Sequence, residues 1–166
     1  MKWLTALNHA DVDIQVALSK KEVQAKVKEV THSKWQEAWD VDSKGRHLNS
    51  IQQLVGNGRS VYKNRKEDII ISRLRIGHSG LNYSLFKIGK HATGKCRNCD
   101  ESETIEHILF SCQQYENERI LLIQEMEKLD INTYNIQSFL ECNFEQWKKY
   151  RAIIKFIKDI GLYGII

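Results

Sequence analysis

Three cysteines and a histidine in the second half of the chain have the spacing of ligands to one metal ion. Cys96 and Cys99 are separated by two residues, His107 follows after seven more and Cys112 after a further four, giving Cys-x2-Cys-x7-His-x4-Cys. A Cys-x2-Cys turn supplies two thiolates from one loop, and a histidine and a third cysteine complete the tetrahedral set that zinc prefers. Four protein ligands leave no position for a reactive water. The spacing therefore predicts one structural Zn2+ in a knuckle at about residues 94–114.

The other interpretations of the cysteines account for less of the pattern. Four unrelated buried residues need not follow ligand order, and a thioredoxin-like pair needs a surrounding βαβ pattern that is missing here. Cys142 has no His or Asp partner nearby in sequence, so we expect an ordinary thiol on an apolar face. The apolar run Trp3 to Leu7 is too short for a signal peptide. We expect a reducing intracellular compartment, nucleus or cytoplasm, where such cysteines are ligands more often than disulfides.

Length and hydropathy exclude several classes of protein. The chain has 166 residues with 42% hydrophobic and 28% charged residues, which predicts one compact unit and excludes wholesale disorder. The longest aliphatic run, Ile69 to Ile71, is far shorter than the roughly 20 residues that cross a bilayer. We therefore expect no membrane association.

The sequence contains no proline, so the strongest helix breaker is missing and helices should dominate. Ser19 and Glu22 form a capping-box pattern that starts a predicted helix at 20–40, and residues 44–58 are a polar connection. Further helices are predicted at 64–76, ended by Gly77, and at 81–88, 113–129, 136–144 and 147–161. The predicted fold class is mainly α, a small helical domain over 19–166 with an embedded CCHC zinc knuckle.

Apolar spacing within two of these helices predicts which side chains are buried. In the first helix, Val23, Val27, Val30 and Ala38 recur on one face, and Trp35 and Trp39 lie four apart on a neighbouring face. We interpret both tryptophans as core aromatics rather than as a stacking platform for bases. In the 64–76 helix, Arg73 falls among the apolar positions and is predicted to be buried and paired, whereas Arg75 points away toward solvent.

Charge is distributed unevenly along the chain. Residues 44–97 contain 12 Lys and Arg against 2 Asp and Glu, and residues 98–145 contain 2 against 11. A basic belt of this kind is typical of a phosphate-binding surface, although it can also neutralise the acidic stretch within the molecule. The predicted phosphate contacts are Arg59, Lys63, Arg65, Lys66, Arg75, Lys87, Lys90, Lys95 and Arg97.

The basic residues crowd the approach to the first cysteine ligands, so a metal would hold a basic loop against phosphate. Zinc knuckles recur in RNA recognition, and Tyr83 and Phe86 are candidates for stacking on bases. The alternative is that zinc only ties helices together. In that case the acidic 98–145 stretch is the candidate surface for a protein partner.

Several segments together resemble the C-terminal region of non-LTR (LINE-type) retrotransposon polyproteins. The resemblance covers about residues 15–125 and rests on these segments: Trp35-x3-Trp39-Asp40, Lys44-Gly45-Arg46-His47-Leu48, Arg73-Leu74-Arg75-Ile76-Gly77-His78, and Cys96 to Cys112 with Glu103-Thr104-Ile105-Glu106-His107. It implies a segment that binds element RNA or target DNA during target-primed reverse transcription, with the family's zinc ligands at Cys96, Cys99, His107 and Cys112. We predict that the chain binds RNA or single-stranded DNA.

The resemblance also implies a non-catalytic chain. Residues 1–18 are similar to the tail that follows an RNase H domain, whose metal-binding carboxylates precede that tail, and Asp11 and Asp13 do not match them. We therefore expect no enzyme activity and no small-molecule substrate. A zinc-stapled protein-interaction module and a remnant RNase H-like nuclease are the alternatives, although two carboxylates alone make a two-metal nuclease improbable.

Overall fold

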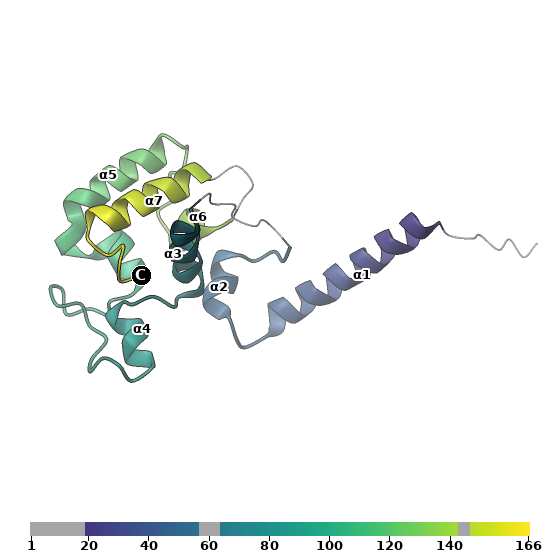
Figure 1. Cartoon of the computed structure of the whole chain (residues 1–166), viewed down its shortest axis with the longest axis horizontal. Helices are drawn as coiled ribbons and strands as arrows, with labels where there is room; N and C mark the ends of the chain where they lie inside the picture. Colours follow the sequence, from purple (N-terminus) through teal and green to yellow (C-terminus); the bar gives the residue numbers. More distant parts are fainter. Residues whose placement is uncertain (1–18, 57–63, 143–146) are drawn as a thin grey trace, which may run out of the picture.

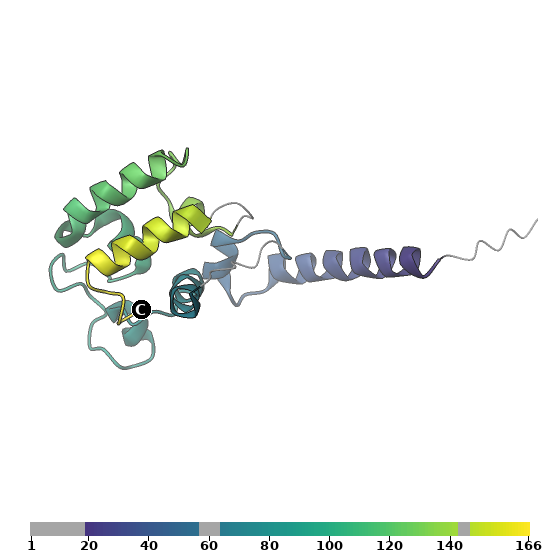
Figure 2. The ribbon, with the colours of Figure 1, turned by 45° about the horizontal axis from the view of Figure 1, so that its top comes forward.

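The computed structural model describes residues 19–56, 64–142 and 147–166. These parts of the chain are mostly helical, as the sequence predicts, with no β-strand beyond one isolated bridge between Lys95 and Ser102. Helices α2 (Arg46–Ile51), α3 (Arg65–Ile76), α5 (Glu116–Glu127), α6 (Ile136–Leu140) and α7 (Trp147–Asp159) form one body (Figures 1 and 2). Helix α4 (Asn82–Lys87) and the cysteine region lie at one side of this body, and α1 (Lys20–Val41) projects from another. The tail predicted at 1–18 lies outside the described residues.

Helix α1 (Lys20–Val41) begins at the predicted capping box. The backbone N–H of Glu22 donates to Ser19 Oγ (3.3 Å), and the backbone N–H of Ser19 donates to Glu22 Oε2 (2.7 Å). The prediction that this helix packs through its valines and tryptophans is wrong. No α1 residue is buried, the Trp35 side chain is 55% exposed, and Trp39 is half-buried. The body of the molecule lies beside only the C-terminal half of α1, so the apolar spacing has no core to face.

Hydrogen bonds from one face of α1 hold it to the extended residues 52–55. Gln36 Nε2 donates to the carbonyl of Gln53 (2.9 Å), and Gln36 Oε1 accepts from the backbone N–H of Val55 (2.9 Å). On either side, Trp39 Nε1 donates to the Gln52 carbonyl (3.0 Å) and His32 Nε2 lies 3.1 Å from the Val55 carbonyl oxygen. These contacts fix the direction of the helix through polar groups rather than through apolar burial.

Helix α2 (Arg46–Ile51) lies in a segment whose composition predicts a polar connection. Gly45 precedes it at φ +67, in the left-handed region that favours glycine, and Ile51 is fully buried. His47 Nε2 lies 3.3 Å from the Leu74 carbonyl oxygen. The segment is helical because one buried isoleucine docks it on α3, a tertiary contact that its composition does not reveal.

Helix α3 (Arg65–Ile76) has the predicted bounds. Asn64 Oδ1 accepts from the backbone N–H of Lys66 (3.0 Å), and Gly77 ends the helix at φ +79. The predicted roles of its two arginines are reversed. Arg73 is exposed and donates to the Ile166 carbonyl (2.5 Å), whereas Arg75 is half-buried and donates to Gln52 Oε1 (3.0 Å).

The reversal follows from which face of α3 is buried. Ile70, Ile71 and Leu74 are buried, whereas Ile69 and Ile76 are exposed. The buried stripe is therefore centred one position further along than the sequence spacing suggests, and this brings Arg75 inward. The Arg75 Nε is a buried atom without a hydrogen-bond partner.

The core lies between α3, α6 (Ile136–Leu140), α5 (Glu116–Glu127) and α7 (Trp147–Asp159), with α5 and α7 side by side (Figures 1 and 2). Its side chains are large aliphatic and aromatic groups, including Leu122, Met126, Phe139, Leu140, Ile153, Ile154, Phe156 and Ile157. Within the described residues, no helix is both long enough and apolar enough to cross a membrane.

Candidate metal centre

The four residues of the Cys/His pattern converge on one point. Their candidate ligand atoms all lie within 4.8 Å of one another, with Cys96, His107 and Cys112 buried and Cys99 half-buried. The cysteines are not joined by disulfides, because the Cys112 Sγ lies 3.9 Å from Cys96 Sγ and 3.8 Å from Cys99 Sγ. The cluster could hold a metal ion.

The sulfur spacing fits a tetrahedral site. A tetrahedron with metal–sulfur bonds of about 2.3 Å has sulfur–sulfur edges of about 3.8 Å, which matches both measured separations. The fourth corner belongs to His107, whose Nε2 is a buried atom with no hydrogen-bond partner. Because a buried polar atom without a partner is costly, the orphaned nitrogen is best explained as a ligand atom.

The other ring nitrogen of His107 is held by polar neighbours. Glu101 Oε2 lies 2.9 Å from Nδ1, and Ser111 Oγ lies 3.2 Å from it. A carboxylate at Nδ1 favours the tautomer that carries its proton there and leaves the Nε2 lone pair toward the cluster. This is the arrangement in which a histidine binds a metal through Nε2.

A tight turn brings the first two cysteines together. The Cys96 N–H donates to the Glu101 carbonyl (2.7 Å), and the Asp100 N–H donates to the Cys96 carbonyl (3.2 Å). Asp100 takes a left-handed conformation (φ +56), which Asp tolerates better than most residues. The turn places Cys99 beside Cys96 and carries the Glu101 side chain toward His107.

His107 and Cys112 lie on and directly after a short helical segment that begins at Ile105. Thr104 Oγ1 accepts from the backbone N–H of His107 (3.1 Å), as a helix cap does. Residues His107–Ser111 form a π-helical turn, and the Cys112 N–H donates to the His107 carbonyl (2.7 Å). Such turns occur frequently at functional sites. Here the wider turn brings ligands five residues apart to the same place.

Without a bound cation, the Cys112 thiol should keep its proton. Burial is the main cause that raises the pKa of the Cys112 thiol to about 12. Thiolates are the metal-binding form of cysteine, so a bound cation must replace this proton.

The loop that leads into the cluster folds back on α4 (Asn82–Lys87). A Cβ on Gly94 would lie 2.9 Å from the Phe86 Cβ, so only glycine fits this approach without displacement. Asn82 Nδ2 donates to the Lys95 carbonyl (2.9 Å), and the Asn82 N–H donates to Glu103 Oε2 (2.7 Å). Helix α4, the loop and the four ligands therefore form one hydrogen-bonded unit, which we call the α4–knuckle unit (residues 82–112).

The structure brings only some of the predicted phosphate contacts together. Arg59 and Lys63 lie outside the described residues, and Arg75 is committed to Gln52. Arg65 and Lys66 are exposed at the start of α3. The α4–knuckle unit carries four more exposed cations, which we call the knuckle cations: Lys87, Lys90, Lys95 and Arg97.

Internal neutralisation of the basic belt is slight in the described parts of the chain. Among the knuckle cations, only Lys95 forms an ion pair there, with Asp100 at 2.9 Å. Lys87 Nζ lies over the Tyr83 ring at 4.6 Å from its centroid, and Lys66 Nζ lies over Tyr163 at 4.3 Å. Most of the charge therefore faces solvent without a carboxylate.

The two predicted stacking residues differ in accessibility. Tyr83 is half-buried with the Lys87 ammonium above its ring, whereas the Phe86 ring is 46% exposed on α4. Cys142 is buried, as expected, and far in sequence from the cluster. Sequence reasoning missed Glu101 and Ser111, although an acidic residue between the second cysteine and the histidine is a signal that can be sought.

Comparison with known proteins adds no relative: no protein-family model, curated protein or solved structure matches the chain.

Proposed function

We propose that Cys96, Cys99, His107 and Cys112 hold one structural Zn2+ and that the α4–knuckle unit binds RNA or single-stranded DNA. The observation that carries the proposal is the position of the ligand cluster beside the exposed knuckle cations, of which only Lys95 has a carboxylate partner within the described residues. Three sulfurs and one imidazole nitrogen match zinc better than Ca2+ or Mg2+, which prefer oxygen ligands.

The proposed binding is electrostatic and non-catalytic. Bound zinc supplies four strong bonds that keep the loop folded, because all four ligand positions are filled by protein. The knuckle cations then contact phosphates, which gives affinity with little dependence on base sequence. Phe86, the more exposed of the two predicted stacking residues, offers one face to an unpaired base, and this favours single strands over duplexes.

The resemblance to LINE-type polyproteins agrees with this function and suggests an origin for it. In that interpretation the chain corresponds to a nucleic-acid-binding segment whose polymerase and nuclease belong to other parts of the polyprotein. No residue of the described site is assigned a catalytic role.

Fluorescence anisotropy with a labelled single-stranded RNA tests the proposal, using zinc-loaded protein from 50 to 300 mM salt. With four phosphate contacts, the slope of log affinity against log salt should be about −2.8, at roughly −0.7 per contact on single strands. Lys87→Ala should make this slope shallower by about 0.7. The matched control is Lys148→Ala, which removes an exposed lysine from α7 and should leave the slope unchanged.

Absent or salt-independent binding by the zinc-loaded protein would overturn the nucleic-acid proposal. The metal would then only tie the helices of the chain together. Recovery of the RNA after incubation with Mg2+ separates binding from the nuclease alternative. Intact RNA is expected, and Mg2+-dependent cleavage that copurifies with the chain would favour the remnant nuclease.

A further inference from the structure

Helix α1 presents an apolar stripe that nothing in the described parts of its own chain covers. Val23, Val27 and Val30 lie on one face at helical spacing, and their side chains are 44%, 59% and 44% exposed. On a helical projection, Lys20, Lys26 and Lys34 fall within or beside this stripe, so the face is both apolar and basic. We call it the α1 stripe.

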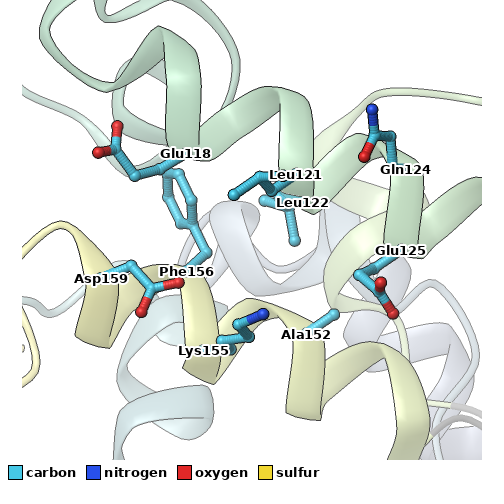
Figure 3. A pocket seen from close by; sticks show the side chains of 9 residues that line it. All are labelled: Glu118, Leu121, Leu122, Gln124, Glu125, Ala152, Lys155, Phe156 and Asp159. Carbon is cyan, nitrogen blue, oxygen red and sulfur yellow. The ribbon is translucent and has the colours of Figure 1, made fainter.

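A second apolar surface of opposite charge lies between α5 and α7. Leu121, Leu122, Ala152 and Phe156 line a hollow there, edged by Glu118, Glu125 and Asp159, with Lys155 also on its wall (Figure 3). Leu121 is 53% exposed, whereas Leu122 and Phe156 are largely buried beside it. We call this surface the α5–α7 groove.

Helix α5 has more apolar surface than the core can cover. Leu122 and Met126 face the core, whereas Ile120 and Leu121 face outward. The outward side of α5 also carries Glu116, Glu118, Glu125 and Glu127, whereas its arginine, Arg119, turns inward to the carbonyls of Leu109 and Cys112.

The α1 stripe cannot reach the groove of its own chain. The C-terminal half of helix α1 is held to residues 52–55 by the contacts of His32, Gln36 and Trp39 described above. From there the helix runs away from α5 and α7 in both views (Figures 1 and 2). Any α1 that fills the groove must come from another molecule.

We propose that two copies of this chain form a reciprocal dimer in which the α1 stripe of each lies in the α5–α7 groove of the other. Charge complementarity favours the α1 stripe as the occupant of the groove, because its lysines would meet the carboxylates of the groove. The lengths also agree: the end residues of Val23–Val30 and of Glu118–Glu125 are seven positions apart, about 10 Å at roughly 1.5 Å per residue. Two identical contacts close the assembly around a two-fold axis, the commonest oligomeric symmetry.

Three existing features weaken the attraction between the two surfaces. Lys26 of the stripe already binds Glu29 at 3.0 Å, and Glu125 of the groove already binds Lys128 at 2.6 Å. Lys155 adds a positive charge to the groove wall. Glu118 and Asp159 form no ion pair within the described residues, so they remain available for the lysines of a partner.

Charge-reversal variants of the two surfaces test the proposal on the full chain, with no nucleic acid present. The native chain should sediment as a concentration-dependent dimer in analytical ultracentrifugation. Lys26→Glu with Lys34→Glu reverses the stripe, and Glu118→Lys with Glu125→Lys reverses the groove. Each double variant alone should be monomeric at concentrations where the native chain is dimeric. An equimolar mixture should form a heterodimer, because both of its contacts then join opposite charges.

Controls separate docking from damage to the fold. Val27→Asp should abolish the dimer, whereas Ala25→Asp, on the opposite face of α1, should not, and circular dichroism should show the same helix content for both. A native chain that remains monomeric throughout would overturn the proposal. A groove-reversed variant that still dimerises alone would also overturn it, because the occupant would then lie elsewhere.

Discussion

The α4–knuckle unit and the helical core are stabilised by different means. Between residues 89 and 104 only Gly94 and Cys96 are buried, so this loop has almost no apolar interior. The core, in contrast, encloses whole side chains such as Phe139, Leu140 and Ile153. Apolar burial contributes roughly 1.5–3 kcal/mol per large side chain, which supports the core and leaves the loop without a comparable term.

The two regions nevertheless share one segment. Ile105, Ile108 and Leu109 belong to the core, yet they lie on the same turns as His107 and next to Cys112. The segment gives two ligands a rigid base, while Cys96 and Cys99 depend on the loop. Loss of the metal should therefore unfold the loop first and leave α5, α6 and α7 in place.

Metal removal should have the largest effect. Structural zinc contributes on the order of 10 kcal/mol to the folding of small knuckles, so a chelator or Cys99→Ser should release residues 89–104. Amide hydrogen exchange should lose protection there and retain it in α5 and α7. Cys142→Ser is the control, because Cys142 lies outside the cluster. Unchanged protection of the loop after chelation would mean that hydrogen bonds alone fold it.

Phe139→Ala should destabilise the helical core and leave the metal cluster intact, which is the converse of metal removal. The Phe139 ring packs edge-on against Phe110 with centroids 5.1 Å apart and is 1% exposed, so truncation leaves a cavity. The free energy of unfolding measured in urea should fall by about 3–5 kcal/mol. Zinc affinity should stay within a few-fold of the native value. Trp147→Ala, at an exposed position, is the control, and a joint loss of zinc affinity and core stability in Phe139→Ala would break the separation of the two regions.

Lys149 is the charged exception within the core. Its side chain is 1% exposed, Nζ donates to the Ser138 carbonyl (2.9 Å), and burial lowers its pKa from 10.5 to about 8. Between these two values the unfolded chain holds a proton that the folded chain releases, so stability should rise with pH there. Below pH 8 both states are protonated and the full penalty applies, up to about 3 kcal/mol.

Lys149→Met should therefore stabilise the protein at pH 7, and the gain should shrink toward pH 9.5. Urea unfolding at the two pH values measures this change, with exposed Lys148→Met as the control. A destabilised Lys149→Met at pH 7 would mean that the hydrogen bond to Ser138 outweighs the cost of burying the charge.

Local signals in the sequence predict part of this architecture. The bounds of α1 and α3 follow from Ser19 with Glu22 and from Asn64 with Gly77, because caps act within one turn of the chain. The ligand cluster follows from spacing, since turn and helix geometry limit where the four residues can lie. The resemblance to retrotransposon polyproteins stays a prediction.

Features that depend on tertiary contacts were not predictable in the same way. The valines of α1 define a face, but sequence does not say whether a partner covers it. A shift of one position in the buried face of α3 exchanged the roles of Arg73 and Arg75. Helix α2 depends on the burial of Ile51.

Glu101→Gln should have the smallest effect, because it changes only a partner of one candidate ligand. The Glu101 carboxylate contacts His107 Nδ1 at 2.9 Å while its side chain is 66% exposed, so its removal should neither unfold the loop nor disturb the core. Outer partners of metal-bound histidines contribute 10- to 100-fold to affinity, about 1.4–2.8 kcal/mol. Competition with a chromophoric chelator should show zinc affinity lower by this factor. Glu106→Gln removes the same charge from an exposed neighbour and should leave affinity unchanged. Equal losses in the two variants would assign the effect to net charge rather than to orientation of the imidazole, whereas a loss confined to Glu101→Gln would make this carboxylate a positioning residue of the site.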